Sequence, residues 1–561
     1  MSDLNQVHGV AGLKQYDVKT INIVFMIYCL VAAGAFGIEE MIPASGPGVT
    51  LIMLMVFPFI WAWPISSMVA EMGAILPSEG GVYVWVKEAF GEFWGFQAGW
   101  WNTVSIYITN GIYVALVVGY IGKFIEMSVL TAFGVKILMI VAFTIINLLG
   151  IREVGWVSTF LSICILIGFS VVAIVGFANW NMNPFDPVVA PELGAFEAIG
   201  GSIAICIWMY CGYECISNMA GEVKNPQVIP KGLLIAMPLI ALTYVLPTMA
   251  GLASVGAWEN WATEGEGTVG YSDVLTQFMG PAWGVAFLVI AVISQCAIFN
   301  TYLASGSRGF FVLADDHLCP KFLVKVSKGR GVPYVGILSL AVVTMLLAQF
   351  DFATLVMAEV VFVLALYVIL PLAVIKYRKV VPLSKRERFY RIPGGNVGLY
   401  FCCGIVVLIS VLALMINGTD YFLIGIAGIG TGPIAYLFFK QFYGGMYKTD
   451  PVKYPINLKT KLAAGDIIRI SYYCLLSGGI GIFGRFFLGW FEGDWGTEYY
   501  MEENGEGFLG NFEGMLSALL IVSVFVLLLG IALYLIGSKA DRFPGKIPEE
   551  PAMENEEATI D

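Results

Sequence analysis

The chain has 561 residues, of which 58% are hydrophobic and 13% are charged, and it carries a net charge of −11. This composition, with a mean hydropathy of +0.81, excludes a soluble globular protein. Apolar runs recur along the whole chain without the alternation typical of barrel strands, which predicts a polytopic bundle of membrane-spanning helices.

The apolar runs predict about fourteen membrane spans, taken here in chain order. They lie near residues 19–43, 49–72, 93–127, 130–150, 155–179, 197–220, 232–256, 281–312, 334–350, 353–375, 396–416, 420–440, 467–490 and 513–537.

The connections between these spans differ in charge. Residues 321–331 and 376–391 are basic, whereas 258–273 and 492–507 are acidic. Since cytoplasmic loops of membrane proteins are rich in Lys and Arg, we expect both termini in the cytoplasm and the protein in the plasma or inner membrane.

The first span contains two adjacent carboxylates, Glu39 and Glu40, in the stretch "LVAAGAFGIEEMIPASGPG" (30–48). Gly34 and Gly37 precede them and make unwinding of the helix inexpensive. Broken membrane helices occur where the freed backbone lines a protected cavity, commonly a substrate site. The alternative is a packing motif, with glycines for close helix contact and glutamates paired or near the outer interface.

A second candidate break lies five spans later, in "AICIWMYCGYECISNMAGEVKNPQVIPKG" (204–232). Gly212 stands at the interruption and Glu214 follows it. This is the position at which an inverted repeat would place a partner for the first break. Cys211 and Cys215 stand one turn apart, but without histidine or further thiols nearby they lack the ligand set of a soft metal.

Cysteine and histidine usage predicts neither a metal site nor a cofactor. The ten cysteines fall almost entirely within apolar runs, where cysteine behaves as a small hydrophobe. The two histidines, His8 and His317, lie outside the expected spans, which argues against a haem or redox centre in the membrane.

Two segments of the sequence resemble those of a known family. "GYECISNMAGEVKNPQVIPKG" (212–232) is similar to the sixth-span signature of the amino acid, polyamine and organocation transporter superfamily, and "NTYLASGSRGFFVLADDHLCPKF" (300–322) is similar to its eighth-span ending. The resemblance implies an all-α, LeuT-like core of ten spans in two inverted repeats, with spans one and six unwound around the substrate. The implied organisation is a cytoplasmic N-terminus (1–18), repeat one (19–179), repeat two (197–375), spans eleven and twelve (396–440), two extra C-terminal spans (467–537) and a cytoplasmic acidic tail (538–561).

A narrower resemblance is to the plant polyamine uptake branch of this superfamily. "GAFGIEE" (34–40) and the proline-rich segment 57–100 are similar to its first and second spans. In the sixth span that branch has an aromatic residue with Asp where this chain has Tyr213 and Glu214, and the Gly-x-Glu pattern also occurs in amino acid antiporters. A cationic amine and a zwitterionic amino acid therefore both stay open as substrates.

The resemblance also assigns roles around the two breaks. In amino acid permeases of this fold, backbone N–H groups at the start of the outer half of span one hold the substrate carboxylate. Here Glu39 and Glu40 would compete for those donors and attract a cation instead, with Glu214 opposite. The candidate substrate-binding residues are Gly34, Ala35, Phe36, Gly37, Glu39, Glu40, Trp208, Cys211, Gly212, Tyr213 and Glu214.

The sequence leaves two questions open. The coupling ion could be a proton or sodium, and the mode of transport could be uptake or exchange. The glutamates Glu39, Glu40 and Glu214 could carry protons, and the fifth span lacks the lysine that some relatives use. A sodium site would need the hydroxyls of Ser305 and Ser307, although such residues more often serve helix packing. We expect the lipid bilayer and a small amine or amino acid as partners, and no nucleic acid; the sequence leaves the oligomeric state open.

Two other classes fit the sequence poorly. A membrane enzyme would need histidine or clustered acid–base groups at one interface, which the sequence lacks. A receptor would need outer segments long enough to fold as domains, and the outer loops are short. We therefore expect a transporter and no enzyme.

Overall fold

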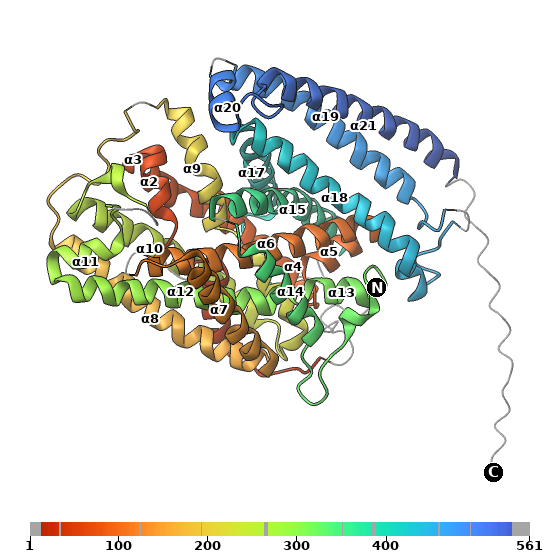
Figure 1. Cartoon of the computed structure of the whole chain (residues 1–561). Helices are drawn as coiled ribbons and strands as arrows, with labels where there is room; N and C mark the ends of the chain where they lie inside the picture. Colours follow the sequence, from red (N-terminus) through yellow and green to blue (C-terminus); the bar gives the residue numbers. More distant parts are fainter. Residues whose placement is uncertain are drawn as a thin grey trace, which may run out of the picture.

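The computed structural model describes residues 13–540 except 33–34, 123–124, 192, 263–266, 351, 383–388, 458–459 and 494. Within this part the chain is helical, with a few isolated β-bridges (Figure 1). The α-helices are α1 (Thr20–Val31), α2 (Met41–Ser45), α3 (Pro47–Phe57), α4 (Trp63–Ile75), α5 (Val82–Phe90), α6 (Glu92–Gly122), α7 (Val129–Leu149), α8 (Ile151–Ala178), α9 (Ala195–Met209), α10 (Val228–Ser254), α11 (Tyr271–Met279), α12 (Pro281–Gly306), α13 (Gly309–Asp315), α14 (Tyr334–Leu347), α15 (Phe352–Val380), α17 (Gly395–Ile416), α18 (Thr419–Tyr443), α19 (Asp466–Phe491), α20 (Gly496–Asn504) and α21 (Phe512–Ala540). The 3₁₀ segments are η1 (Ile38–Glu40), η3 (Tyr213–Glu222), η4 (Trp258–Asn260), η5 (Lys321–Val324) and η6 (Gly445–Lys448), and η2 (Pro58–Ala62) is a π-helical turn.

Within the described residues, the helices follow the positions of the predicted spans, and twelve of the fourteen are long and apolar enough to cross a membrane. Two shorter apolar helices, α1 and α14, stand where the first and ninth spans were predicted. The first is short because its helix ends at Val31, before the glycine-rich stretch.

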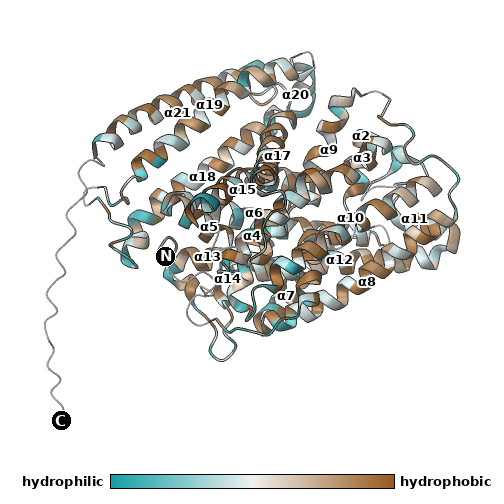
Figure 2. Cartoon of the chain, turned by 180° about the vertical axis from the view of Figure 1, so that it is seen from behind, coloured by the Kyte–Doolittle hydropathy of each residue, from teal (hydrophilic) through white to brown (hydrophobic). Residues whose placement is uncertain are grey.

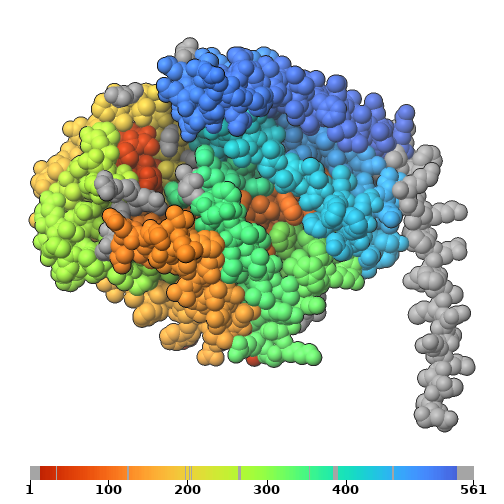
Figure 3. Space-filling view, in the orientation of Figure 1, coloured from red at the N-terminus to blue at the C-terminus, as the bar shows by residue number. Residues whose placement is uncertain are grey.

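The last two spans lie at the edge of the molecule. α19 and α21 run side by side along one side of the bundle, where α19 packs against α17 and α18 (Figure 1). Hydrophobic residues follow the long helices, including this outer pair (Figure 2). In the space-filling view only a small part of the N-terminal red segment reaches the surface, since α1 is enclosed by its neighbours (Figure 3).

Glycine conformation explains the two helix breaks. Gly37 precedes η1 with a φ of 92°, and Gly212 precedes η3 with a φ of 98°, both in the left-handed region that favours glycine. A Cβ on Gly212 would also lie 2.5 Å from the Leu30 carbonyl oxygen and from the Tyr302 hydroxyl. Gly212 is therefore required both by its own backbone angle and by the close approach of spans one and six.

A short segment ahead of α1 is bonded to the end of η3. The Tyr16 N–H donates to the Glu222 carbonyl (2.8 Å), and the Lys224 N–H donates to the Tyr16 carbonyl (3.0 Å). The Gln15 side chain donates to the Gly221 carbonyl (3.3 Å). These bonds hold the start of span one against the end of span six.

Candidate functional site

The two broken spans meet at one side chain, Tyr244 of α10. Its hydroxyl lies 3.0 Å from the Val31 carbonyl oxygen at the end of α1 and 2.7 Å from the Met209 carbonyl oxygen at the end of α9. A hydroxyl has one proton, so it can donate to one of these carbonyls at a time. The C-terminal ends of two helices, each with a partial negative charge, thus converge inside the bundle.

The Glu39 carboxylate accepts a hydrogen bond from a backbone N–H group at the break of span one. Its side chain is 2% exposed, and its Oε2 accepts a hydrogen bond of 2.8 Å from the Gly37 N–H. The next residue, Glu40, is partly exposed and Ala35 is fully buried. Gly34, also a predicted site residue, lies outside the described residues.

Glu214 stands in the corresponding place at the break of span six. Its side chain is 3% exposed, and its Oε2 accepts a hydrogen bond of 2.5 Å from the Tyr367 hydroxyl of α15. The backbone N–H groups of Gly212 and Glu214 also interact with this carboxyl group. At both breaks, therefore, a carboxylate of the chain itself covers the freed backbone donors.

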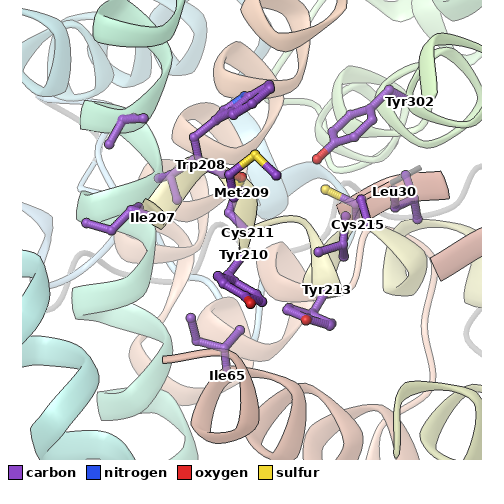
Figure 4. Packing of buried hydrophobic residues seen from close by; sticks show 14 of the residues in the cluster. Leu30, Ile65, Ile207, Trp208, Met209, Tyr210, Cys211, Tyr213, Cys215 and Tyr302 are labelled. Carbon is purple, nitrogen blue, oxygen red and sulfur yellow. The ribbon is translucent and has the colours of Figure 1, made fainter. Parts of the chain in front are cut away.

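Near the second break, the aromatic side chains extend in two different directions. In Figure 4, Trp208 and Tyr302 lie above the unwound segment, whereas Tyr210 and Tyr213 lie below it, next to Ile65 of α4. The Tyr213 hydroxyl has no hydrogen-bond partner among the described residues. Of the predicted aromatic candidates in this span, Trp208 and Tyr213 therefore face different surroundings.

Trp208 belongs to a wall of rings drawn from several helices. Its ring centroid lies 6.0 Å from that of Tyr113 of α6 and 5.5 Å from that of Phe352 of α15. Tyr113 in turn lies 5.6 Å from Tyr302 of α12. The Cys211 thiol, which donates to the Trp208 carbonyl (3.0 Å), interacts electrostatically with Tyr113.

Phe36 belongs to another aromatic cluster. Its ring lies 4.8 Å from Phe169 of α8, 5.1 Å from Tyr120 of α6 and 5.8 Å from Phe287 of α12. Tyr271, which interacts electrostatically with Glu39, packs on the same cluster. Phe36 thus belongs to the cluster that also contains Tyr271, which interacts with Glu39.

The two predicted sodium-site hydroxyls both serve contacts within the protein. Ser305 donates to the Cys215 carbonyl (2.8 Å) and accepts from the Asn218 amide (3.2 Å). Ser307 donates to the Ala304 carbonyl (2.7 Å) and lies beside Arg308. Their role in ion coupling stays a prediction, as does that of the glutamates.

A third buried carboxylate, Glu359 of α15, was absent from the sequence-based site. Its side chain is 2% exposed, it is hydrogen-bonded with Thr109 of α6, and it interacts electrostatically with Glu214. The available signal was a lone carboxylate in the apolar run "ATLVMAEVVFVLALYVILP" (353–371), since ionisable residues inside the membrane are costly and usually functional. Tyr367, the partner of Glu214, lies on the same helix.

Several other buried carboxylates differ from Glu214 and Glu359 in having cation partners. These ion pairs include residues at or next to the ends of α5, α13 and α18, and we call the region of the pairs the α13 end. The pairs are Glu71–Arg378, Glu222–Arg308, Glu79–Arg308, Glu92–Lys440, Asp316–Lys87 and Asp466–Arg469. Among the described residues, neither Glu214 nor Glu359 has such a partner, and no group of His, Cys, Asp and Glu side chains could hold a metal ion.

Comparison with known proteins places this site in a transporter fold. The sequence profile of the amino acid permease family matches residues 18–445. Polyamine transporter PUT1 of Oryza sativa subsp. japonica is 30% identical over 424 residues, covering 74% of this chain and 76% of that protein. Branched-chain amino acid permease BcaP of Lactococcus lactis subsp. cremoris is 28% identical over 421 residues, covering 68% and 86%. The crystal structure of MhsT in complex with L-phenylalanine matches with a TM-score of 0.54 at 14% identity, covering 72% of this chain and 99% of MhsT, and shows the LeuT-like fold.

Proposed function

We propose, from the premise that this chain belongs to the amino acid permease family, that it carries a small organic cation such as a di- or polyamine across a membrane. The chain is a multi-pass membrane transporter. The proposal assigns it no enzymatic step.

The carboxylate of Glu39 carries this proposal. It already accepts the Gly37 N–H at the break of span one, where a substrate carboxylate would need free donors. It would also repel an incoming anion. Glu214 covers donors at the second break in the same way, so the site offers negative charge to a ligand from both broken spans.

The surroundings of the breaks support the same class of substrate. The ends of α1 and α9 converge at Tyr244, and helix C-termini stabilise cations. The ring faces of Trp208 and Tyr113 suit an ammonium group that has left water. The name of the rice relative, a polyamine transporter, is in accord with this chemistry.

A zwitterionic amino acid is the second candidate. The relative from Lactococcus lactis is a branched-chain amino acid permease, and the ammonium group of an amino acid could use the same carbonyls and carboxylates. The two candidates differ in one group, the substrate carboxylate.

Putrescine and ornithine differ by that carboxyl group, and their competition for binding to the purified protein at fixed pH separates the candidates. We expect the native protein to prefer putrescine and Glu39→Ser to shift the ratio toward ornithine by uncovering the Gly37 N–H. Glu40→Ser removes the same charge one residue away and should shift the ratio less. A native preference for ornithine that neither substitution moves would favour the amino acid.

We further propose that the protein lies in the plasma or inner membrane with both termini in the cytoplasm. Its transport is coupled to protons or to the exchange of one substrate for another. The basic segments 321–331 and 376–391 support this orientation. Gly267 lies in an acidic connection with open space around it. A cysteine introduced there should react with an impermeant reagent on intact cells, and protection would reverse the topology.

A further inference from the structure

Glu359 is buried in the span formed by α15 and interacts electrostatically with Glu214, in a place to which the sequence assigned no role. We propose that Glu359 and Glu214 together form the subsite that receives an ammonium group of the substrate. This inference rests on the proposed transport of an organic cation and names the side chains that bind one charged end of it.

The first argument is an unused acceptor. The Oε2 atom of Glu359 is buried and has no hydrogen-bond partner among the described residues, although Thr109 is bonded to the same carboxyl group. Buried polar atoms are almost always paired, and an unpaired one at a charged group is costly. An ammonium group brings three N–H donors and would satisfy it.

The second argument is charge. Glu214 and Glu359 interact electrostatically with each other, and no Lys, Arg or His of the described residues forms an ion pair with either. Two neighbouring carboxyl groups removed from water need a positive charge to offset repulsion and lost hydration. At the α13 end arginine and lysine side chains supply it, so at this site a cationic ligand is the natural counterpart.

The third argument is the composition of the surrounding walls. Tyr421 of α18 interacts electrostatically with Glu359, and its hydroxyl is buried with no hydrogen-bond partner among the described residues. Tyr113 of α6 interacts with the same carboxyl group and stands beside Trp208. An oxygen acceptor and aromatic faces next to a carboxylate are the groups that recognise an ammonium ion.

The tyrosine bond to Glu214 leaves Glu359 as the more available of the two carboxyl groups. Tyr367 donates to the Glu214 Oε2 and the Cys215 thiol lies 3.6 Å from its Oε1, so both Glu214 oxygens have neighbours. Among the described residues, Thr109 is the one hydrogen-bond partner of the Glu359 carboxyl group, whose Oε2 has none. We therefore expect Glu359 to make the shorter contact with the ligand and Glu214 to add charge.

Equilibrium binding of radiolabelled putrescine to the purified full-length protein tests this subsite. Glu359→Gln keeps the shape and the Thr109 contact but removes the charge, and we expect putrescine to bind about ten- to a hundred-fold more weakly. Glu359→Asp keeps the charge and should lose less. Glu492→Gln is a control for the removal of a buried carboxylate, because Glu492 is bonded to Thr419 and Tyr500 and to neither Glu214 nor Glu359 among the described residues.

Each outcome is decisive. Weaker binding by Glu359→Gln alone, with an unfolding temperature near the native value, supports the subsite. Native-like putrescine affinity in Glu359→Gln overturns it, and if uphill uptake is nevertheless lost, Glu359 serves ion movement rather than ligand binding. A native protein that binds ornithine and no putrescine overturns the proposed function, and this inference with it.

Discussion

Buried carboxylates at the α13 end have different neighbours from Glu214 and Glu359 in the membrane interior. At the α13 end Glu92 lies 2.6 Å from the Lys440 ammonium, and Glu71 lies 2.5 Å from the Arg378 guanidinium. Glu214, at the second break, is bonded to a tyrosine, and Glu359, in α15, is bonded to a threonine; neither forms an ion pair within the described residues. Lys and Arg side chains neutralise the first group. Glu214 and Glu359 have no such cation among the described residues.

This difference separates two roles for the same kind of side chain. A carboxylate with an internal cation connects helices, so removal of either partner is expected to act on stability. A carboxylate of the membrane interior without one, such as Glu214 or Glu359, costs stability in the empty protein and gains from a bound cation, so its removal is expected to act on binding.

The largest expected effect is at the ion pair between α6 and α18. Lys440→Met leaves the fully buried Glu92 without its cation, which typically costs about 3–5 kcal/mol in the free energy of unfolding. Thermal unfolding of the purified protein measures the loss. The double variant Glu92→Gln with Lys440→Met should recover most of it, and a single variant as stable as the native protein would contradict the structural role.

The next effect is at Glu214, where we expect weaker binding without a loss of stability. Glu214→Gln keeps an oxygen for the Tyr367 hydroxyl and removes the charge, which should weaken substrate binding by tens- to a hundred-fold, about 2–3 kcal/mol. Binding and thermal unfolding are measured on the same preparation. Unchanged affinity would rule out an ionic contact, and a large drop in unfolding temperature would place Glu214 with the structural group.

The smallest effect concerns the hydroxyl that joins the two broken helices. Tyr244→Phe removes its hydrogen bonds to the Val31 and Met209 carbonyls, which should cost about 1 kcal/mol of unfolding free energy. Tyr421→Phe removes a buried hydroxyl without a partner among the described residues and should cost no stability. Equal unfolding temperatures for the two variants would show that the helix ends do not depend on Tyr244.

The positions of the breaks could be predicted from sequence because the signal is local. Gly37 and Gly212 have the left-handed angles that favour glycine, and Glu39 and Glu214 follow them within two residues. Twelve of the fourteen predicted spans likewise coincide with helices long and apolar enough to cross a membrane, because each depends on the hydropathy of one continuous segment.

Side-chain direction and long-range contacts could not be predicted in this way. Tyr213 and Glu214 are adjacent in sequence, yet Glu214 reaches Tyr367 of α15 while Tyr213 points towards α4. The importance of Glu359 depends on a neighbour more than a hundred residues away, and it has no glycine or motif beside it. A lone carboxylate in an apolar run identifies a residue of interest but not its partner.

The segment ahead of α1 ties the start of span one to the end of span six through the backbone of Tyr16. Separation of these two spans at the α13 end must break the bonds from Tyr16 to Glu222 and from Lys224 to Tyr16, while Tyr244 still joins the opposite ends of α1 and α9. The amide protons of Tyr16 and Lys224 are thus protected only while this end is closed. The rate of their hydrogen–deuterium exchange therefore reports how often the α13 end opens, and the measurement needs no substrate.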